Sequence, residues 1–284
     1  MSYQMRVWIA GAKGRLGHAL CEAYENNSDF KLLKSDKEVP VEDLEEVLLF
    51  ANVSRPNVII NCAGLTDDRI CEENPDEAYR INALGARNLA IAARRLDVKM
   101  VQISTDDVFG GQHNKAKNEF DFPTPTTVYG KSKLAGEDLV KSLTDKHLII
   151  RSSWLYGLGT QDFVDYILEK AKSSEDIELP YESYSTPTSA GALAGFVEKL
   201  IETDEYGIFH ASCEGGCSRA DWAREILRFT GHANIAVRTS NIERIKPPFT
   251  LLDNMMMRIT GVYQMPEWKE ELHAYLKEMN HEEE

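Results

Sequence analysis

The feature that most constrains the fold is an alternation of short apolar runs with amphipathic stretches in the first half of the chain. Apolar runs of strand length recur near 7–10, 30–33, 57–60, 98–103 and 148–151. Segments with helical spacing of apolar residues follow them at 15–26, 41–53, 75–92 and 129–143. Strands that alternate with helices form right-handed βαβ units, and strands buried on both faces are apolar throughout. The sequence therefore predicts an α/β fold, a Rossmann-type doubly wound parallel sheet.

The second half of the chain has a looser pattern, with glycine and proline between its segments. Helical spacing recurs at 162–173, 189–202, 218–230 and 266–279, and an apolar run lies near 208–210. We expect residues 1–155 to form the sheet domain and residues 156–284 to form a smaller, mixed α/β lobe. We also expect the segment from about 189 to 211 to return to the sheet.

Composition narrows the possible partners. The chain has 284 residues, with 32 Lys and Arg against 46 Asp and Glu, so its formal charge is −14. This charge repels phosphates, and we expect neither a nucleic-acid nor a membrane partner. No apolar run reaches the roughly 18 residues that span a bilayer, and the first residues do not resemble a secretory signal. These features predict a cytoplasmic protein.

The cysteines and acidic residues do not form a recognisable metal site. The five cysteines are odd in number and scattered, which is typical of reduced thiols. Cys213 and Cys217 are the one close pair, but no second Cys or His pair stands at ligand spacing. We therefore expect no catalytic metal.

A glycine-rich turn follows the first predicted strand and opens the first predicted helix. Its residues are Gly11, Ala12, Lys13, Gly14, Arg15, Leu16 and Gly17. Glycine lets the backbone approach a pyrophosphate closely, and the N-terminus of a helix offers free N–H groups to an anion. The turn follows a predicted strand and precedes a predicted helix, as the dinucleotide-binding motif requires, so it predicts a dinucleotide site. We therefore expect residues 1–155 to form a dinucleotide-binding domain.

Asp36 lies just after the second predicted strand, 19 residues beyond Gly17. A carboxylate at this distance binds the adenosine ribose of a dinucleotide. The neighbouring Lys34 and Lys37 would instead favour a 2′-phosphate, so the sequence leaves NADH and NADPH open as cofactors.

The fourth predicted strand ends in Ser104, Thr105 and Asp106, where a parallel sheet places its ligands. A helix then carries Tyr129 and Lys133, and residues four apart share one helix face. An ammonium beside a phenol lowers the phenol pKa toward the working range, so we expect Lys133 to lower the pKa of Tyr129. The same spacing recurs at Tyr166 and Lys170, which we assign to packing on an amphipathic helix.

These residues together resemble the dTDP-4-dehydrorhamnose reductase family of the extended short-chain dehydrogenase/reductase superfamily. The resemblance spans nearly the whole chain. Its motifs are Gly11/Gly14/Gly17, Asn61–Gly64, Asn82–Gly85, Ser104–Phe109, Val128–Lys133, Arg151–Gly157, Ser185–Thr188 and Leu252–Asn254.

The resemblance implies an NAD(P)H-dependent reductase that acts on the C4 ketone of a nucleotide-linked 6-deoxyhexulose, with residues 156–284 as the substrate-binding lobe. It implies that Tyr129 protonates the ketone oxygen, that Lys133 tunes Tyr129 and binds the nicotinamide ribose, and that Thr105 binds the ketone oxygen. The other residues with implied roles are Cys62, Ala63, Gly64 and Asn82 along the cofactor, and Asp106 and Trp154 on the substrate side. Capping by Asp106 and core packing by Trp154 remain as alternatives.

Two acidic residues depart from the family pattern. Asp107 stands where the family usually has tyrosine, and Asp68 stands where it usually has valine. Both would bring carboxylates near a pocket for a diphosphate sugar. The alternatives are therefore a reductase of a different keto-sugar nucleotide, or a non-catalytic dinucleotide-binding subunit of the same fold. A homodimer is compatible with the resemblance, but the sequence does not fix the oligomeric state.

Overall fold

The central element of the protein is a six-stranded parallel sheet. The computed structural model describes residues 4–25, 27–111, 114–173, 176–179, 183–240 and 246–282. The strands run in the spatial order β2, β1, β3, β4, β5, β10. Their bounds are β1 Met5–Ala10, β2 Phe30–Ser35, β3 Val58–Asn61, β4 Lys99–Thr105, β5 His147–Ser152 and β10 Gly207–His210. The chain crosses from β2 past β1 to β3, which is the reversal that defines a doubly wound sheet and confirms the predicted fold class.

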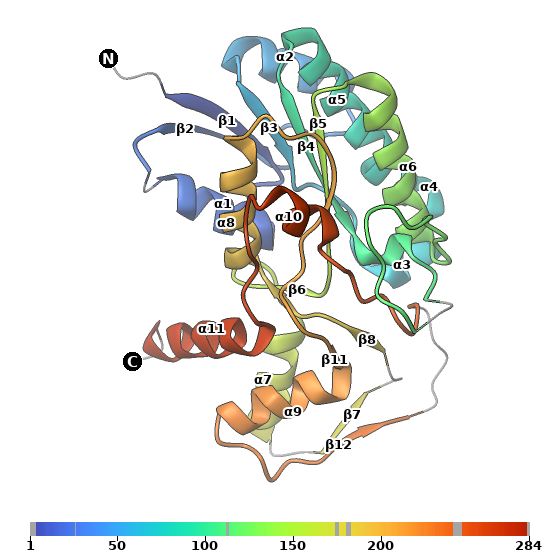
Figure 1. The fold of residues 1–284 in the computed structure, drawn as a ribbon, viewed down its shortest axis with the longest axis vertical. Coiled ribbons are helices and arrows are strands. Elements are labelled where there is room, and N and C mark those ends of the chain that lie inside the picture. The colour runs from blue at the N-terminus through green and yellow to red at the C-terminus, as the bar shows by residue number, and fades with distance from the viewer. Residues whose placement is uncertain are drawn as a thin grey trace.

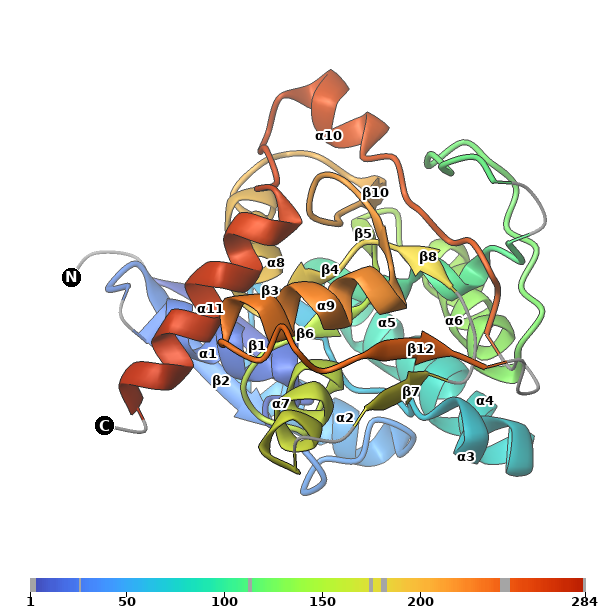
Figure 2. The same ribbon diagram turned by 90° about the horizontal axis from the view of Figure 1, so that it is seen from below.

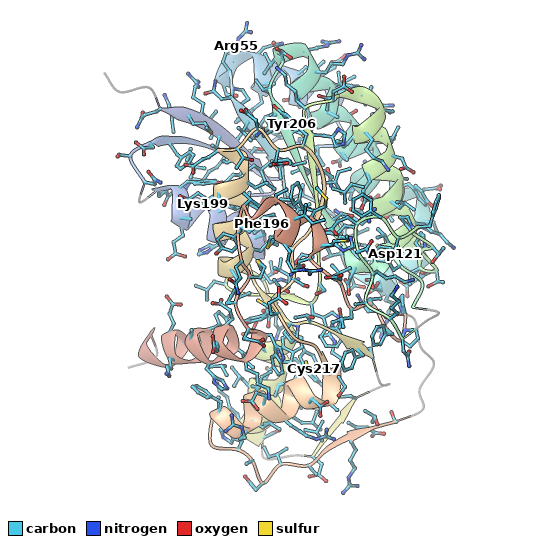
Figure 3. The ribbon with its side chains drawn as sticks, viewed as in Figure 1. Arg55, Asp121, Phe196, Lys199, Tyr206 and Cys217 are labelled. Carbon is cyan, nitrogen blue, oxygen red and sulfur yellow. The ribbon has the colours of Figure 1, made fainter. Side chains whose placement is uncertain are left out.

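Helices cover both faces of this sheet (Figure 1). On one face α1 (Arg15–Glu25) packs against α8 (Ala190–Ile201), and the core there includes Phe196, labelled in Figure 3. The other face carries α2 (Leu44–Ser54), α5 (Gly85–Leu96) and α6 (Val128–Leu143). Residues 7–10 of β1 are fully buried between the two layers, which explains why the strand is apolar throughout.

Several elements after β5 gather at one end of the molecule and form what we call the second lobe (Figures 1 and 2). The second lobe contains three two-stranded ladders, which pair β6 with β9, β7 with β12, and β8 with β11. Its strands are β6 Leu155–Tyr156, β7 Ile177–Leu179, β8 Tyr184–Ser185, β9 Thr188–Ser189, β11 Cys217–Ser218 and β12 Val237–Thr239. Its helices are α7 Phe163–Ser173, α9 Arg219–Phe229 and α11 Trp268–Glu282, whereas α10 Met255–Thr260 lies beside β10.

The helix predicted over 75–92 is present, but one turn within it is π-helical. The structure has α4 (Pro75–Tyr79), then a π-helical turn η1 (Arg80–Leu84), and then α5. The π turn contains the buried Asn82, whose side chain binds a neighbouring loop. Hydrophobic periodicity could not reveal this π turn, because one inserted residue leaves most of the apolar spacing intact. The sequence also did not predict α3 (Asp68–Glu73) or α10, each of which has only six residues.

A buried ion pair joins α6 to the sheet. Glu137 of α6 accepts two hydrogen bonds from Arg151 of β5, at 2.9 and 2.7 Å, and both side chains are almost fully buried. Ser104 of β4 donates to the same carboxylate at 2.5 Å. The Nε2 of His210 on β10 lies 3.4 Å from Arg151, and burial lowers the pKa of His210 to about 3. This network links α6 to three adjacent strands.

In the described part of the chain, no helix is both long enough and apolar enough to cross a membrane. All five cysteines are free thiols, and four of them are buried, including Cys217 in the second lobe (Figure 3).

We expect Gly17→Ala to destabilise the protein by about 1–3 kcal/mol, because overpacking a tight contact forces the backbone apart. A Cβ at Gly17 would lie 2.2 Å from the carbonyl oxygen of Gly11. The matched control is Gly191→Ala, also within a helix, where a Cβ would meet nothing within 4 Å. Urea unfolding measures both, and equal stability of the two variants would contradict the expectation.

Replacing Glu137 by Gln should destabilise the protein by about 3–5 kcal/mol, because the Arg151 guanidinium then stays buried without its carboxylate. The double variant Glu137→Leu/Arg151→Met removes both charges and should recover most of the loss. Free energies of unfolding from denaturant titrations provide the comparison. A single variant as stable as wild type would show that the buried charge does not need this partner.

Candidate active site

A pocket of about 350 Å³ opens at the carboxyl ends of the central strands. Its walls come from the loops after β1, β3, β4 and β5, and from the start of α6. Among the residues with predicted roles, the pocket is lined by Gly14, Arg15, Leu16, Cys62, Ala63, Gly64, Thr105, Asp106, Tyr129, Lys133 and Trp154. The predicted residues that do not line it are Gly11, Gly17, Asp36 and Asn82.

The glycine-rich turn has the shape of a phosphate-binding loop. Gly11 has a φ of +82°, and a Cβ there would lie 2.5 Å from the backbone nitrogen of Ala63. Gly11 and Gly17 therefore allow the turn to pack closely, while Gly14, Arg15 and Leu16 present the N-terminus of α1 to the pocket. Arg15 also donates to the side chain of Thr160 at 3.1 Å, which links this loop to the segment before α7.

Asp36 lies at the end of β2, beside the glycine-rich turn. Its two carboxylate oxygens accept hydrogen bonds from the backbone N–H of Lys13 at 3.0 Å and of Lys37 at 2.9 Å. The carboxylate therefore joins the end of β2 to the glycine-rich turn.

The loop after β3 is held by Asn82. The side chain of Asn82 accepts from the N–H of Leu65 at 2.8 Å and donates to the carbonyl of Leu65 at 2.9 Å. It also donates to Ser132 of α6 at 2.9 Å. Asn82 is buried, so it supports the pocket-lining segment Cys62–Gly64 from behind.

The start of α6 brings Tyr129 to the end of β4. Thr127 caps the helix by accepting from the N–H of Gly130 at 3.0 Å. A Cβ at Gly130 would lie 2.2 Å from the carbonyl oxygen of Asp107, so glycine lets the helix approach the strand end. Tyr129 and Thr105 therefore line the same pocket.

Lys133 lies one turn after Tyr129 and lines the same pocket. Its ammonium donates to the carbonyl of Ile103 at 2.6 Å. Burial lowers the pKa of Lys133 to about 8, and the carboxylate of Glu137 opposes this shift. The side chain is thus desolvated, but most of it still carries its charge at neutral pH.

The pKa of Tyr129 departs from the prediction. We expected Lys133 to lower it, but burial and the carboxylate of Asp107 raise it above its usual value. The ammonium of Lys246 and the hydrogen bond with Thr105 oppose this rise. The prediction was wrong because it considered only the residue one helical turn away, and the dominant charges come from other segments.

Asp106 lies in the pocket wall and binds both the Thr105 turn and two distant segments. Although it lines the pocket, its Oδ2 accepts from Ser185 at 2.9 Å and from Thr250 at 2.5 Å. Thr105 donates to its Oδ1 at 3.3 Å. The carboxylate is therefore bonded to Ser185, Thr250 and the Thr105 turn.

Trp154 lies in the wall of the pocket that faces the second lobe. The residue has a φ of +39°, an uncommon backbone conformation for a side chain of this size. Its ring stacks on Trp222 with 5.7 Å between centroids, and the Arg219 guanidinium lies 4.0 Å from its centroid. Trp154 therefore both lines the pocket and packs against Trp222.

Several pocket residues had no assigned role in the sequence. Arg219 is one, since it stands at the start of an ordinary amphipathic helix with no local motif. Lys246 is another, since the local sequence around Lys246 and Pro247 contains no motif that assigned it a role. Lys246 binds Asp68 at 2.9 Å and Asp107 at 3.0 Å, so the two departures from the family pattern meet at one ammonium.

Comparison with known proteins agrees with this geometry. Residues 5–281 match the family model described as RmlD substrate binding domain. The chain is 32% identical over 277 residues to the spore coat polysaccharide biosynthesis protein SpsK of Bacillus subtilis, which covers 96% of this chain and 97% of that protein.

Two solved structures are similar over almost the full length. One is a dTDP-4-dehydrorhamnose reductase from Clostridium acetobutylicum, with 37% identity, a TM-score of 0.93, and coverage of 97% of this chain and 100% of that one. The other is a dTDP-4-dehydrorhamnose reductase from Bacillus anthracis in complex with NADP, with 35% identity, a TM-score of 0.92, and coverage of 98% and 99%. With its dinucleotide-type loop, its Thr105–Tyr129–Lys133 pocket and these relatives, the chain belongs to the dTDP-4-dehydrorhamnose reductase family.

Proposed function

We propose that the protein is an NAD(P)H-dependent reductase of the C4 ketone of a nucleotide-activated 6-deoxyhexulose, and that it converts dTDP-4-dehydrorhamnose to dTDP-rhamnose. The observation that carries the proposal is the placement of Thr105, Tyr129 and Lys133 in one pocket at the carboxyl end of the sheet. Family membership supports the same reaction.

The loop at the start of α1 is suited to a dinucleotide. Gly11 and Gly17 leave no space for a Cβ, so the backbone stays close to the position of a pyrophosphate, and Arg15 adds a positive charge there. Asp36 would hold the adenosine ribose, and Cys62–Gly64 would line the path toward the nicotinamide. When bound, the reduced nicotinamide supplies the hydride.

Three side chains then act on the ketone. Thr105 donates a hydrogen bond to the ketone oxygen and stabilises the negative charge that develops there. Tyr129 transfers its phenolic proton to that oxygen, and its raised pKa keeps the phenol protonated at neutral pH. Lys133, one helical turn after Tyr129 in the same pocket, would hold the nicotinamide ribose.

The substrate side of the pocket is formed by the second lobe. Trp154 would contact the sugar, and Asp106 would hold the Thr105 turn against Ser185 and Thr250. We further propose that residues 1–155 bind the dinucleotide and residues 156–284 bind the substrate, apart from about 189–211, whose strand β10 pairs with β5. A cytoplasmic location and a homodimer complete the proposal.

Tyr129→Phe should reduce the rate of keto-sugar-dependent NADPH or NADH oxidation by about 10²-fold or more, because the proton donor is lost. Binding of the cofactor should be retained, since the ring remains. The assay follows nicotinamide absorbance with dTDP-4-dehydrorhamnose as substrate. If the wild-type protein binds the cofactor but no keto-sugar stimulates cofactor oxidation, the alternative of a non-catalytic subunit is favoured.

Asp36→Asn should raise the KM for NADH about tenfold, because a hydrogen bond from the ribose to a charged acceptor is worth about 1.5 kcal/mol or more. The effect on NADPH should be smaller, since removing the carboxylate also removes its repulsion of the 2′-phosphate. Steady-state kinetics with both cofactors provide an internal control. An equal change for both cofactors would mean that Asp36 only holds the loop through Lys13 and Lys37.

A further inference from the structure

Three charged side chains form a compact cluster at the edge of the active-site pocket. The Nζ of Lys246 lies 2.9 Å from Asp68 of α3 and 3.0 Å from Asp107 of η2 (Asp106–Val108). Their side chains are 28%, 15% and 6% exposed, so the cluster is largely removed from water. Ion pairs at this depth are weakly screened. We call these three residues the acidic clamp.

The acidic clamp lies beside Tyr129. The Nζ of Lys246 is 5.7 Å from the centroid of the Tyr129 ring. Asp107, Lys246 and Tyr129 all line the same pocket. Asp107 is also two residues from Thr105, which binds the phenol. The clamp therefore acts on the phenol over distances at which single charges change a pKa.

Several charged or titratable groups surround the start of α6. Asp68 and Cys71 come from α3, Asp107 from η2, Lys246 from the second lobe and Lys133 from α6 itself. The clamp carries two carboxylates and one ammonium, so its net charge is negative. A carboxylate disfavours a phenolate, whereas an ammonium favours it. The position of the Lys246 ammonium relative to the two carboxylates thus determines the electrostatic potential at the Tyr129 phenol.

Lys246 is held in this place by both carboxylates. They raise the pKa of Lys246, so it stays protonated, while burial raises the pKa of Asp68. The buried Oδ1 of Asp68 has no hydrogen-bond partner in the described part of the chain. Asp68 therefore depends on Lys246 for compensation of its charge.

We propose that Lys246, fixed by Asp68 and Asp107, is a positioning residue that controls how readily Tyr129 releases its proton. In the proposed reduction, the O–H bond of Tyr129 breaks as the former ketone oxygen gains that proton, and the electron pair stays on the phenolate. Lys246 stabilises this phenolate and Asp107 destabilises it. The catalytic consequence rests on the proposed function, but the effect on the phenol does not.

The test is a titration of Tyr129 that needs no turnover. The protein is labelled with 3-fluorotyrosine, whose fluorine makes the phenol more acidic, and its fluorine resonances are followed by NMR against pH. The resonance of residue 129 is assigned by its loss in Tyr129→Phe. Lys246→Met should move the midpoint up by about one pH unit or more, and Asp107→Asn should move it down by a similar amount.

Matched variants separate this role from a structural one. Lys246→Arg should restore a midpoint near the wild-type value, and Lys246→Met/Asp107→Asn should fall between the two single variants. Lys131→Met, which changes an exposed residue of α6, the helix that carries Tyr129, should leave the midpoint unchanged. Thermal unfolding of each variant identifies any general loss of stability. Shifts of the same sign in Lys246→Met and Asp107→Asn, or no shift in either, would overturn the proposal.

Kinetics provide the catalytic consequence. In the reverse direction, which needs the phenolate, Lys246→Met should lower kcat about tenfold at pH 8 with little change in KM, and Asp107→Asn should raise it. If wild type reduces no keto-sugar, the proposed function fails while the NMR titration still decides the role of Lys246. If wild type is active but the midpoints do not move, only the role of Lys246 fails.

Discussion

The site depends on how closely the first turn of α6 packs against the end of β4. Gly130 permits this contact, because any Cβ there would overlap the carbonyl oxygen of Asp107. The contact brings Tyr129 within hydrogen-bond reach of Thr105. Two turns further along the same helix, Glu137 binds Arg151 of β5 and Ser104 of β4. One helix is thus fixed to the sheet at two points, and Tyr129 lies at the first of them.

The same close packing removes water from the ionisable groups. Burial raises the pKa of Tyr129 and lowers that of Lys133, so desolvation favours the neutral form of both. Nearby charges then decide how far each group departs from its usual value. Lys246 comes from the second lobe and Asp107 from the end of the sheet, so the electrostatics of the pocket depend on how the two parts of the chain meet.

Local patterns predicted the residues that lie near one another in sequence or at strand ends. The glycine-rich turn, Thr105 and the Tyr129–Lys133 pair could be found because a strand end and a helical turn place side chains in known directions. The role of Asp106 could not be predicted in this way. Its partners, Ser185 and Thr250, belong to distant segments, and no periodicity relates them to β4. The π turn around Asn82 was missed because one inserted residue leaves most of the apolar spacing intact.

By itself, the sequence determined the parallel sheet, the order of its strands and helices along the chain, and the residue types available at the carboxyl edge. These follow from hydrophobic periodicity and from backbone freedom at glycine, which are local properties. Only the tertiary structure decided the spatial order of the strands, the position of Lys246 between Asp68 and Asp107, and the direction in which the pKa of Tyr129 shifts. Those features depend on Coulomb interactions and desolvation between residues far apart in sequence, and such distances exist only after the chain has folded.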